Sequence, residues 1–257
     1  MGYGGYIVRA LITGASSGIG KDMAVCLASK GYDLVLVARR TERLEQLKKE
    51  LSNVDVICIT ADLSDTDECK RVYEETKGVE IDMLINNAGF GLAGNFVDTD
   101  LDRELAMVDT NVKAVHILTK LYLRDFVKRD SGVILNVASI AGFMSGPLLA
   151  TYYATKNYVL SLTRAIYKEL KKNKSKVTVS ALCPGPIKTE FFDVANVKFL
   201  IGGVESKSVA KYAVDKALKG KLVILPGIVK FVPFWIRLVP TKFVMSVLYK
   251  FQSMRKG

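Results

Sequence analysis

The sequence predicts an α/β protein in which helices cover both faces of a mostly parallel sheet of about seven strands. The first observation is that short apolar runs, typical of strands buried on both faces, alternate with longer amphipathic segments along nearly the whole chain. The second is that 49% of the 257 residues are apolar, which is enough for one large core. The third is that no linker rich in Pro, Ser or Gly interrupts the pattern. We therefore expect a single domain with three layers, α/β/α.

The strands and helices can be assigned in order from this pattern. The expected strands are Ile7–Thr13, Leu34–Ala38, Val54–Thr60, Met83–Asn86, Val133–Ala138, Val177–Leu182 and Leu222–Leu225. The expected helices are Gly18–Lys30, Thr41–Leu51, a helix that ends near Lys77, Leu101–Lys128 and Tyr152–Lys171. In such a sheet, ligands bind beyond the carboxyl ends of the strands. The polar motifs described next each follow an expected strand.

A glycine-rich turn follows the first expected strand and opens a helix. Its glycines are Gly14, Gly18 and Gly20. Glycines at such a turn let the backbone approach a pyrophosphate closely, and the helix N-terminus offers free N–H groups to the phosphates. The spacing Gly-x-x-x-Gly-x-Gly differs from the more general Gly-x-Gly-x-x-Gly fingerprint. The turn predicts a dinucleotide site, and the alternative interpretation is a plain tight turn.

Two more fragments complete a recognisable set. Asn86-Asn87-Ala88-Gly89 follows the fourth expected strand, and Ser139 lies thirteen positions before Tyr152, with Lys156 one helical turn further on. In this order and spacing, the chain from about Ile7 to Gly227 resembles the one-domain branch of the short-chain dehydrogenase/reductase family. The resemblance implies a Rossmann-type fold. It also implies an oxidoreductase that interconverts a ketone and a secondary alcohol by hydride transfer.

The end of the second expected strand predicts which nicotinamide cofactor binds. An acidic residue there would hold the ribose 2′-hydroxyl of NAD, but Ala38 takes its place and Arg39 follows. A guanidinium pairs with a 2′-phosphate through charge-assisted hydrogen bonds. We therefore expect NADP(H), with Arg39 as the main contact and Arg40 and Ser16 as helpers. The alternative is that both arginines are surface cations at the start of a helix. Asp33 precedes this strand and comes too early to bind the ribose.

The resemblance implies further cofactor contacts around the expected cleft. Asp62 and Leu63 would touch the adenine, although Asp62 or Ser64 could instead cap the next helix. A threonine after the Pro-Gly segment would meet the carboxamide of the nicotinamide. The cofactor-binding residues expected besides the two arginines are Gly14, Ser16, Ser17, Gly18, Ile19, Gly20, Asp62, Leu63, Asn87, Ala88, Gly89, Asn111, Tyr152, Lys156, Pro184, Gly185, Ile187 and Thr189.

The resemblance also assigns the chemistry. Tyr152 would be the acid/base group, but a free tyrosine has a pKa of about 10. Lys156 lies one turn later on the same helix face, so we expect its charge to lower that pKa. Ser139 would donate a hydrogen bond to the substrate oxygen. Asn111 would help a water chain carry protons to solvent. The alternative is a cofactor-binding scaffold or sensor without turnover.

The substrate is expected to be a small apolar carbonyl or alcohol compound. Apolar residues fill Phe90–Ala93, Gly142–Leu149 and the stretch after Thr189, which would line the substrate end of the cleft. In the last stretch they are Phe191, Phe192, Val194, Val197, Phe199, Leu200 and Ile201. A lipid-like, acyl or steroid-like molecule would fit such a lining. The alternative is a lid that packs on its own core.

The C-terminal part differs in composition from the rest. We expect residues 1–227 to form the cofactor-binding domain and residues 228–257 to form an apolar, basic extension. Pro233, Pro240 and several cations interrupt the extension, which argues against a membrane span. It could pack over the substrate cleft, form a subunit interface, or lie on a membrane surface as a peripheral contact.

The net charge, the cysteines and the N-terminus allow further expectations about partners, metals and location. The net charge is +11, but no nucleic-acid recognition motif accompanies it, so we expect no nucleic-acid partner. The four cysteines, Cys26, Cys58, Cys69 and Cys183, are not spaced as metal ligands, so we expect free thiols and no metal. With no signal peptide evident, the expected location is the cytoplasm, and the alternative adds peripheral contact at the inner membrane surface. The resemblance implies a homodimer or homotetramer.

Overall fold

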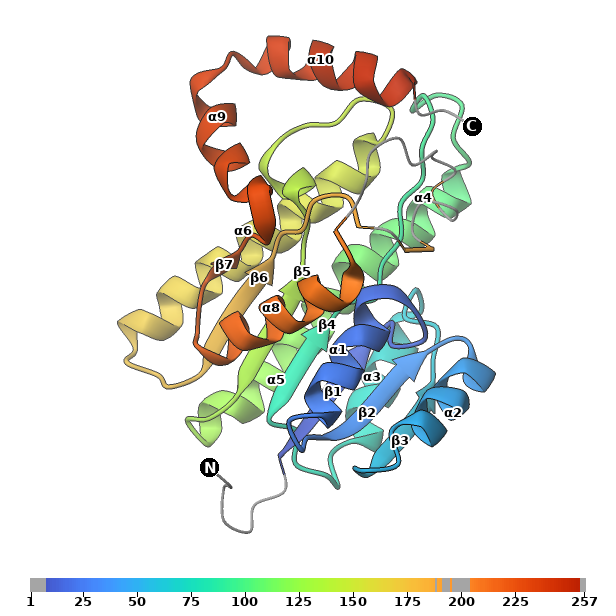
Figure 1. Cartoon of the computed structure of the whole chain (residues 1–257), viewed down its shortest axis with the longest axis vertical. Coiled ribbons are helices and arrows are strands. Elements are labelled where there is room, and N and C mark those ends of the chain that lie inside the picture. The colour runs from blue at the N-terminus through green and yellow to red at the C-terminus, as the bar shows by residue number, and fades with distance from the viewer. Residues whose placement is uncertain (1–7, 188, 191–194, 196–203, 255–257) are drawn as a thin grey trace.

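The computed structural model describes residues 8–187, 189, 190, 195 and 204–254, and in this part of the chain seven strands form one sheet. The order across the sheet is β3-β2-β1-β4-β5-β6-β7, and every neighbouring pair is parallel (Figure 1). The strands are β1 (Arg9–Thr13), β2 (Asp33–Ala38), β3 (Val56–Thr60), β4 (Met83–Asn86), β5 (Val133–Val137), β6 (Thr178–Leu182) and β7 (Val223–Ile224). The predicted fold class is therefore confirmed, with an all-parallel sheet where we expected a mostly parallel one.

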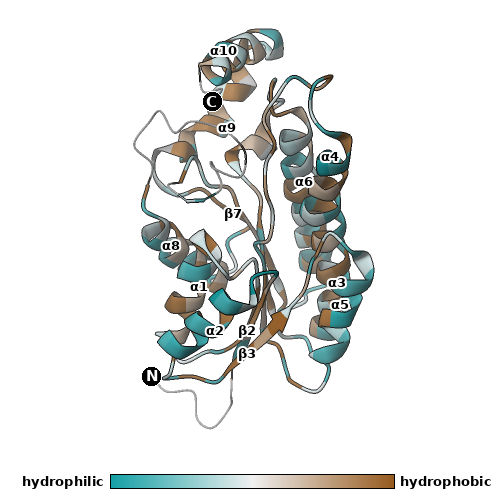
Figure 2. Ribbon diagram, turned by 90° about the vertical axis from the view of Figure 1, so that its right-hand side faces the viewer, coloured by the Kyte–Doolittle hydropathy of each residue, from teal (hydrophilic) through white to brown (hydrophobic). Residues whose placement is uncertain are grey.

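Helices cover both faces of this sheet, as the edge-on view in Figure 2 shows. One face carries α1 (Gly18–Ala28), α2 (Thr41–Glu50) and α8 (Ser206–Leu218). The other carries α3 (Thr66–Glu75), α5 (Val115–Lys128) and α6 (Ala150–Lys172), with α4 (Leu101–Val108) leading into α5. This is the three-layer α/β/α arrangement that the sequence predicts.

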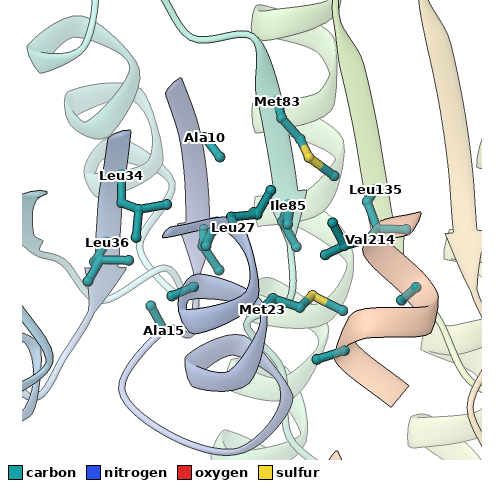
Figure 3. Close-up of a cluster of buried hydrophobic side chains, with 14 of the residues drawn as sticks. Ala10, Ala15, Met23, Leu27, Leu34, Leu36, Met83, Ile85, Leu135 and Val214 are labelled. Carbon is teal, nitrogen blue, oxygen red and sulfur yellow. The ribbon is translucent and has the colours of Figure 1, made fainter. Parts of the chain in front are cut away.

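The strands belong to both cores because successive side chains point to opposite faces. Ala10 and Ile12 of β1 join the core beneath α1 and α8, whereas Leu11 between them joins the core on the α3 and α5 side. Figure 3 shows the first of these cores, where Met23 and Leu27 of α1 lie against the strands. Continuous apolar runs are therefore needed in every central strand, which is the pattern that predicted them.

The strand order reverses between β1 and β4, which lie side by side at the centre of the sheet. Such a switch point leaves a crevice at the carboxyl ends of the two strands, because their connections leave in opposite directions. The glycine turn follows β1 and the Asn87–Gly89 segment follows β4. The topology thus brings the first two sequence motifs together.

The helices differ from expectation at several places. The single helix expected over Leu101–Lys128 contains a π-helical segment, η1 (Asp109–Ala114), between α4 and α5. Helix α8 was not expected. The N-cap of α3 is Asp65, whose side chain accepts a hydrogen bond from the Asp67 amide, so the alternative of an Asp62 or Ser64 cap is wrong.

Asp33 is also placed differently from expectation, because β2 begins at this residue. The carboxylate of Asp33 accepts hydrogen bonds from the Arg9 guanidinium and the Asp55 amide. It therefore fastens the amino end of the sheet. The position remains at the opposite end of β2 from the cleft, which agrees with the prediction that Asp33 does not bind the ribose.

The chain ends in three short helical elements, η3 (Gly227–Phe231), α9 (Val232–Leu238) and α10 (Thr241–Ser253). They stand beyond the carboxyl ends of the strands, at the top of Figure 1. Gln252 of α10 is buried, and its side-chain amide donates to the Tyr153 hydroxyl of α6 at 3.0 Å. Among the described residues, no helix combines the length and the apolar character that crossing a membrane would require.

Candidate active site

A cleft of about 410 Å³ opens at the carboxyl ends of the strands, where the predicted residues converge. It is lined by segments that follow β1, β2, β3, β4, β5 and β6 and by the first turns of α6. The predicted site residues that line it are Gly14, Ser16, Ser17, Gly18, Ile19, Arg39, Arg40, Asp62, Leu63, Asn87, Ala88, Gly89, Ser139, Tyr152, Lys156, Pro184, Gly185, Ile187 and Thr189. Gly20 and Asn111 lie behind this lining.

The glycine turn is held in place by Asn87. Its side-chain amide donates to the carbonyl oxygens of Thr13 and Gly14 at 2.9 and 3.1 Å. A Cβ on Gly14 would lie 2.8 Å from Ala88 Cα, and one on Gly20 would lie 2.4 Å from both Asn87 Nδ2 and Gly14 O. Gly14 also has a φ of +65°. These positions require glycine because backbone approaches backbone there.

A second close approach joins the β4 segment to the π-helical segment. The side chain of Asn111, fully buried, accepts from the Phe90 amide at 3.0 Å and donates to the Phe90 carbonyl at 2.9 Å and to Thr155 Oγ1 at 3.1 Å. A Cβ on Gly89 would lie 2.7 Å from Asn111 Oδ1. Asn111 therefore positions the wall of the cleft, and its expected part in a water chain stays a prediction. Single π turns inside helices are frequent at functional sites.

Further amides tie the strand ends together beneath the cleft. Asn86 Nδ2 donates to Asn136 Oδ1 at 2.9 Å and to Thr119 Oγ1 at 3.0 Å, and Asn136 Nδ2 donates to Thr163 Oγ1 at 3.0 Å. These side chains are buried, so each bond also satisfies a polar group that water cannot reach. They link β4 and β5 to α5 and α6 and hold the strand ends at a fixed spacing.

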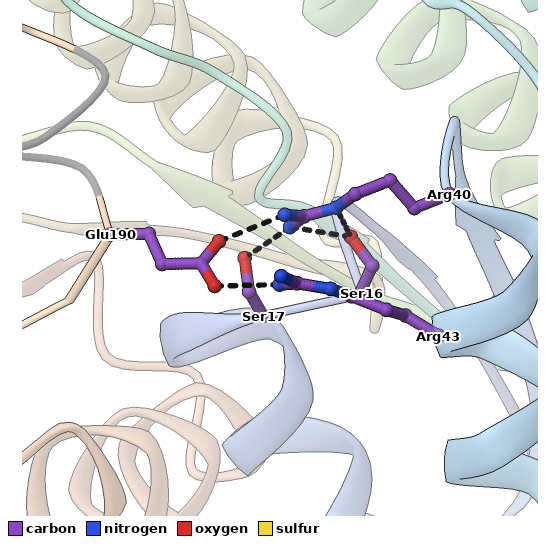
Figure 4. Close-up of polar contacts among 5 residues, drawn as sticks. All are labelled: Ser16, Ser17, Arg40, Arg43 and Glu190. Carbon is purple, nitrogen blue, oxygen red and sulfur yellow. Dashed lines mark hydrogen bonds and ion pairs between the residues drawn. The ribbon is translucent and has the colours of Figure 1, made fainter.

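The guanidinium of Arg40 sits on the glycine turn. It donates to Ser16 Oγ at 3.1 and 3.2 Å and to Ser17 Oγ at 2.8 Å, and it pairs with the Glu190 carboxylate at 2.9 Å (Figure 4). Arg43 holds the other oxygen of the same carboxylate at 2.6 Å. These two arginines lower the pKa of Glu190. The structure thus builds a position for an oxyanion between two guanidinium groups. Arg43 and Glu190 were not predicted, since only folding brings them together.

Arg39 takes a different direction. Its side chain is 69% exposed and lies 3.7 Å from the Asp62 carboxylate, which also accepts hydrogen bonds from Ser64 N and Oγ. Burial raises the pKa of Asp62, but these hydrogen bonds and Arg39 outweigh it and lower the pKa overall. Both arginines line the cleft. The arginine with ordered partners on the glycine turn is Arg40, while the role of Arg39 as the main contact stays a prediction.

Tyr152, Ser139 and Lys156 lie together in the lining of the cleft. Ser139 lies just after β5 as the N-cap of η2 (Ile140–Phe143), and its hydroxyl accepts from the Ala141 amide at 3.1 Å. Lys156 Nζ donates to the Val137 carbonyl at 2.9 Å and lies 5.8 Å from the centre of the Tyr152 ring. Strand β5 and helix α6 therefore hold all three groups together, as the spacing of the motif predicts.

The electrostatics of this triad differ from expectation in one respect. Burial raises the pKa of Tyr152, against the opposing effect of its hydrogen bond with Ser139. The expectation of a lowered pKa is wrong for this structure, because burial is the largest influence on the phenol and raises its pKa overall. Burial also lowers the pKa of Lys156 from 10.5 to about 8. The phenol is thus a proton donor at neutral pH.

The substrate end of the cleft is described in part. Phe90, Ile140, Leu149 and Ala195 line it with apolar surface, and Tyr153 adds a ring beside Tyr152. Of the third predicted lining segment, the seven apolar residues lie outside the described residues. In the part of the chain that the structure describes, no group of three His, Cys, Asp or Glu residues gathers as metal ligands would. His116 pairs with Tyr158 at 2.6 Å, and neither residue lines the cleft.

Comparison with known proteins agrees with this geometry. Residues 8–198 match the family model of the short chain dehydrogenases. The very-long-chain 3-oxoacyl-CoA reductase of Anas platyrhynchos is 32% identical over 198 residues, which cover 74% of this chain and 63% of the duck protein. The chain therefore matches less than two thirds of the length of that relative.

Two solved structures resemble the whole fold. A short-chain dehydrogenase from Sphingobium yanoikuyae in complex with NADPH has a TM-score of 0.83 and 32% identity, covering 90% of this chain and 92% of that one. A structure of a 7β-hydroxysteroid dehydrogenase has a TM-score of 0.81 and 26% identity, covering 94% of this chain and 96% of that one. The similarity thus extends beyond the residues that match the family model.

Proposed function

Because the chain belongs to the short-chain dehydrogenase/reductase family, whose enzymes are oxidoreductases that use a nicotinamide cofactor, we propose that it is an NADP(H)-dependent enzyme acting on apolar ketones or secondary alcohols. The observation that carries this proposal is the meeting of Ser139, Tyr152 and Lys156 in one cleft with the glycine turn. Three separate parts of the chain supply these groups, since Ser139 follows β5, Tyr152 and Lys156 lie on α6, and the glycine turn follows β1.

The residues present fit a dinucleotide. Gly14 and Gly20 leave no room for a Cβ, so the turn can bring its backbone N–H groups close to a pyrophosphate at the N-terminus of α1. Arg40 and Arg43 already hold both oxygens of a carboxylate. A 2′-phosphate would accept the same charge-assisted hydrogen bonds as this carboxylate, and it carries more negative charge. We propose that Arg39, Arg40 and Ser16 bind this phosphate, with Arg43 in support.

The triad supplies the proton chemistry. A nicotinamide cofactor bound in this cleft would supply the hydride for ketone reduction, or accept one in alcohol oxidation. Tyr152 donates its phenolic proton to the oxygen of the reduced carbonyl, and Ser139 donates a hydrogen bond that stabilises the charge on that oxygen. The hydrogen bond to the Val137 carbonyl holds the Lys156 ammonium in place on the polar side of the cleft. Because burial raises the pKa of Tyr152, the proton needed for ketone reduction is present at neutral pH.

An apolar substrate is supported by the described lining and by the relatives. Phe90, Ile140 and Leu149 offer apolar surface in the same cleft as Tyr152. The duck relative is named for an acyl-CoA substrate and one structural relative for a hydroxysteroid. Both classes join a large apolar body to one carbonyl or hydroxyl. A small polar sugar would leave this apolar surface without matching contacts.

The alternative proposal is a scaffold or sensor that binds the cofactor without turnover. It gains no specific support from the described residues, since Asn111, Ser139, Tyr152 and Lys156 are all present. The test is Tyr152→Phe, which removes only the proton-bearing oxygen. With a panel of apolar ketones and NADPH, we expect turnover to fall by about a hundredfold or more. The dissociation constant for NADPH should stay within about twofold of that of the wild type.

The matched control is Tyr158→Phe, on the same helix but bonded to His116 outside the cleft. This variant should keep both turnover and cofactor affinity. Undiminished turnover in Tyr152→Phe would contradict the mechanism. Tight NADPH binding without turnover on any ketone in the wild type would favour the scaffold.

A further inference from the structure

Apolar side chains form an exposed stripe along η3 and α9. Phe231, Phe234, Trp235 and Leu238 lie at spacings of three, four and seven residues, so they share one side of the helical segment. Their exposed fractions are 54%, 62%, 61% and 62%. A stripe with this periodicity ordinarily faces a core, yet here all four side chains face solvent. The chain has a single tryptophan, and it stands in this stripe.

Helix α10 carries a second exposed stripe. Phe243, Val247 and Met254 are exposed by 63%, 52% and 58%, and the ammonium-bearing Lys250 lies on the same side at helical spacing. The opposite side of α10 packs on the domain, where Gln252 is buried against Tyr153. On that side Gln252 contacts the domain, whereas the stripe of Phe243, Val247 and Met254 stays exposed.

All the charged residues of the C-terminal segment are basic. Residues 228–257 contain six Lys or Arg and no Asp or Glu, so they carry +6 of the net +11. Lys230, Lys242 and Lys250 are exposed beside the two stripes. A second copy meeting this surface with its own would bring like charges together without an acidic partner. An anionic surface of low curvature would contact the exposed lysines and both apolar stripes simultaneously.

We propose that the segment Gly227–Met254, here called the arch, docks the protein on an anionic lipid surface. Aromatic residues with cations beside them suit the boundary between headgroups and acyl chains, where Trp in particular is enriched. The exposed lysines add attraction to anionic headgroups. The helices are too short and too polar to cross, so the arch lies in the interface.

The position of the arch relative to the cleft affects how a substrate would reach the site when the protein is docked. A second cavity of about 440 Å³ lies between Met245 of α10 and the Met144–Pro147 segment, and Tyr153 lines both this cavity and the main cleft. The arch thus stands at the substrate side, beyond the carboxyl ends of the strands (Figure 1). If the proposed function holds, an apolar substrate dissolved in lipid lies near the entrance of the site. The docking itself does not depend on that function.

Trp235 provides a direct readout because no other tryptophan contributes to the emission. The experiment titrates the full chain with vesicles of phosphatidylcholine and phosphatidylglycerol, and with vesicles of phosphatidylcholine alone. We expect a blue shift of Trp235 emission and co-sedimentation with the anionic vesicles only, both weakened by high salt. Acyl chains carrying bromine should quench the shifted emission.

Two double variants distinguish binding through the arch from nonspecific binding to vesicles. Phe234→Ser/Leu238→Ser keeps the reporter, and Lys242→Glu/Lys250→Glu reverses two charges. Each should lower the vesicle partition coefficient by about tenfold or more. The matched controls are Phe96→Ser/Val97→Ser, exposed by 67% and 89%, and Lys70→Glu/Lys77→Glu on and just after α3. These controls should bind vesicles as the wild type does, and unchanged circular dichroism will confirm the fold of every variant.

Several results would overturn the proposal. One is an unshifted Trp235 spectrum, with the protein left in the supernatant of anionic vesicles. Another is equal loss of binding in arch and control variants. A third is a dimer in lipid-free solution that the Phe234→Ser/Leu238→Ser variant abolishes, because the stripe would then belong to a subunit interface. NADPH binding and Tyr152-dependent turnover are measured separately, so their failure is distinguishable from failure of docking.

Discussion

Lys156 is a buried charge to which we assign a role in the proposed reaction and whose burial costs stability. Its pKa falls from 10.5 to about 8 in the folded protein, which corresponds to a cost of about 3 kcal/mol for holding the charged form at neutral pH. The hydrogen bond to Val137 is the described compensation. Because the pKa is lowered, the cost is fully present below about pH 8 and disappears as the pH rises toward 10.5.

Lys156→Met should therefore separate activity from stability. We expect turnover to be lost, while the melting temperature at pH 7 stays equal to that of the wild type or rises by a few degrees. The loss of the Val137 hydrogen bond opposes this gain, and so the expected rise is small. Thermal unfolding followed by circular dichroism checks it. A melting temperature lowered by about 5 °C or more would mean that the ammonium stabilises the fold.

The pH dependence of catalysis should reflect the same two groups. Ketone reduction needs protonated Tyr152, whose pKa is raised, so its rate should be flat from about pH 6 to about pH 8. It should fall above about pH 8, as Lys156 loses its charge. Alcohol oxidation needs the phenolate and should accelerate as the pH rises toward 8. Rate profiles in both directions check this, and parallel profiles would contradict the assignment.

The sequence could predict which single residues belong to the site, but it could not predict which side chains pair with one another. Ser139, Tyr152 and Lys156 were identified by spacing within one strand–helix unit, which folding preserves. The pairing of Arg40 with Glu190 joins residues that are 150 positions apart, so no local pattern indicates it. The pKa of Tyr152 was predicted in the wrong direction because the depth of burial is a property of the folded cleft.

At the scale of elements, the glycine turn offers a sharp steric test. A Cβ on Gly20 would lie 2.4 Å from Gly14 O and Asn87 Nδ2, whereas Gly78 has nothing within 4 Å. Gly20→Ala should destabilise the protein by about 1–3 kcal/mol and weaken NADPH binding, because the turn must move. Gly78→Ala should change stability by less than about 1 kcal/mol. Chemical denaturation of both variants checks this, and equal stabilities would contradict the packing of the turn.

The elements that were predicted are those with a strong periodic pattern. The seven strands are short apolar runs, and parallel burial on both faces leaves that signature in the sequence. Helix α8 was missed because its buried face consists largely of alanines among lysines and its N-cap Glu205 makes no side-chain cap. The π-helical segment at Asn111 was missed as well. It differs from an α-helix by its hydrogen-bond register, which the contacts of Asn111 with Phe90 and Thr155 help to fix.

At the scale of the whole molecule, the oligomeric state remains a prediction. The resemblance implies a homodimer or homotetramer through the helices that carry Asn111 and Tyr152. Leu101 and Leu105 on the adjoining α4 are exposed by 67% and 51%, which leaves apolar surface there. We expect sedimentation equilibrium to show a dimer or tetramer that Leu101→Glu/Leu105→Glu dissociates. An unchanged assembly in this variant, together with its loss in an arch variant, would place the interface at the arch instead.

The central claim is an NADP(H)-dependent enzyme whose cofactor choice depends on the arginines after β2. The most direct measurement is a fluorescence titration of the purified protein with NADPH and, separately, NADH, repeated for Arg39→Ala and Arg40→Ala. We predict a clear preference for NADPH, reduced by about tenfold or more in the arginine variants through weaker NADPH binding alone. A preference for NADH, or equal affinities unaffected by the substitutions, would contradict the assignment and leave Arg39 and Arg40 as surface cations.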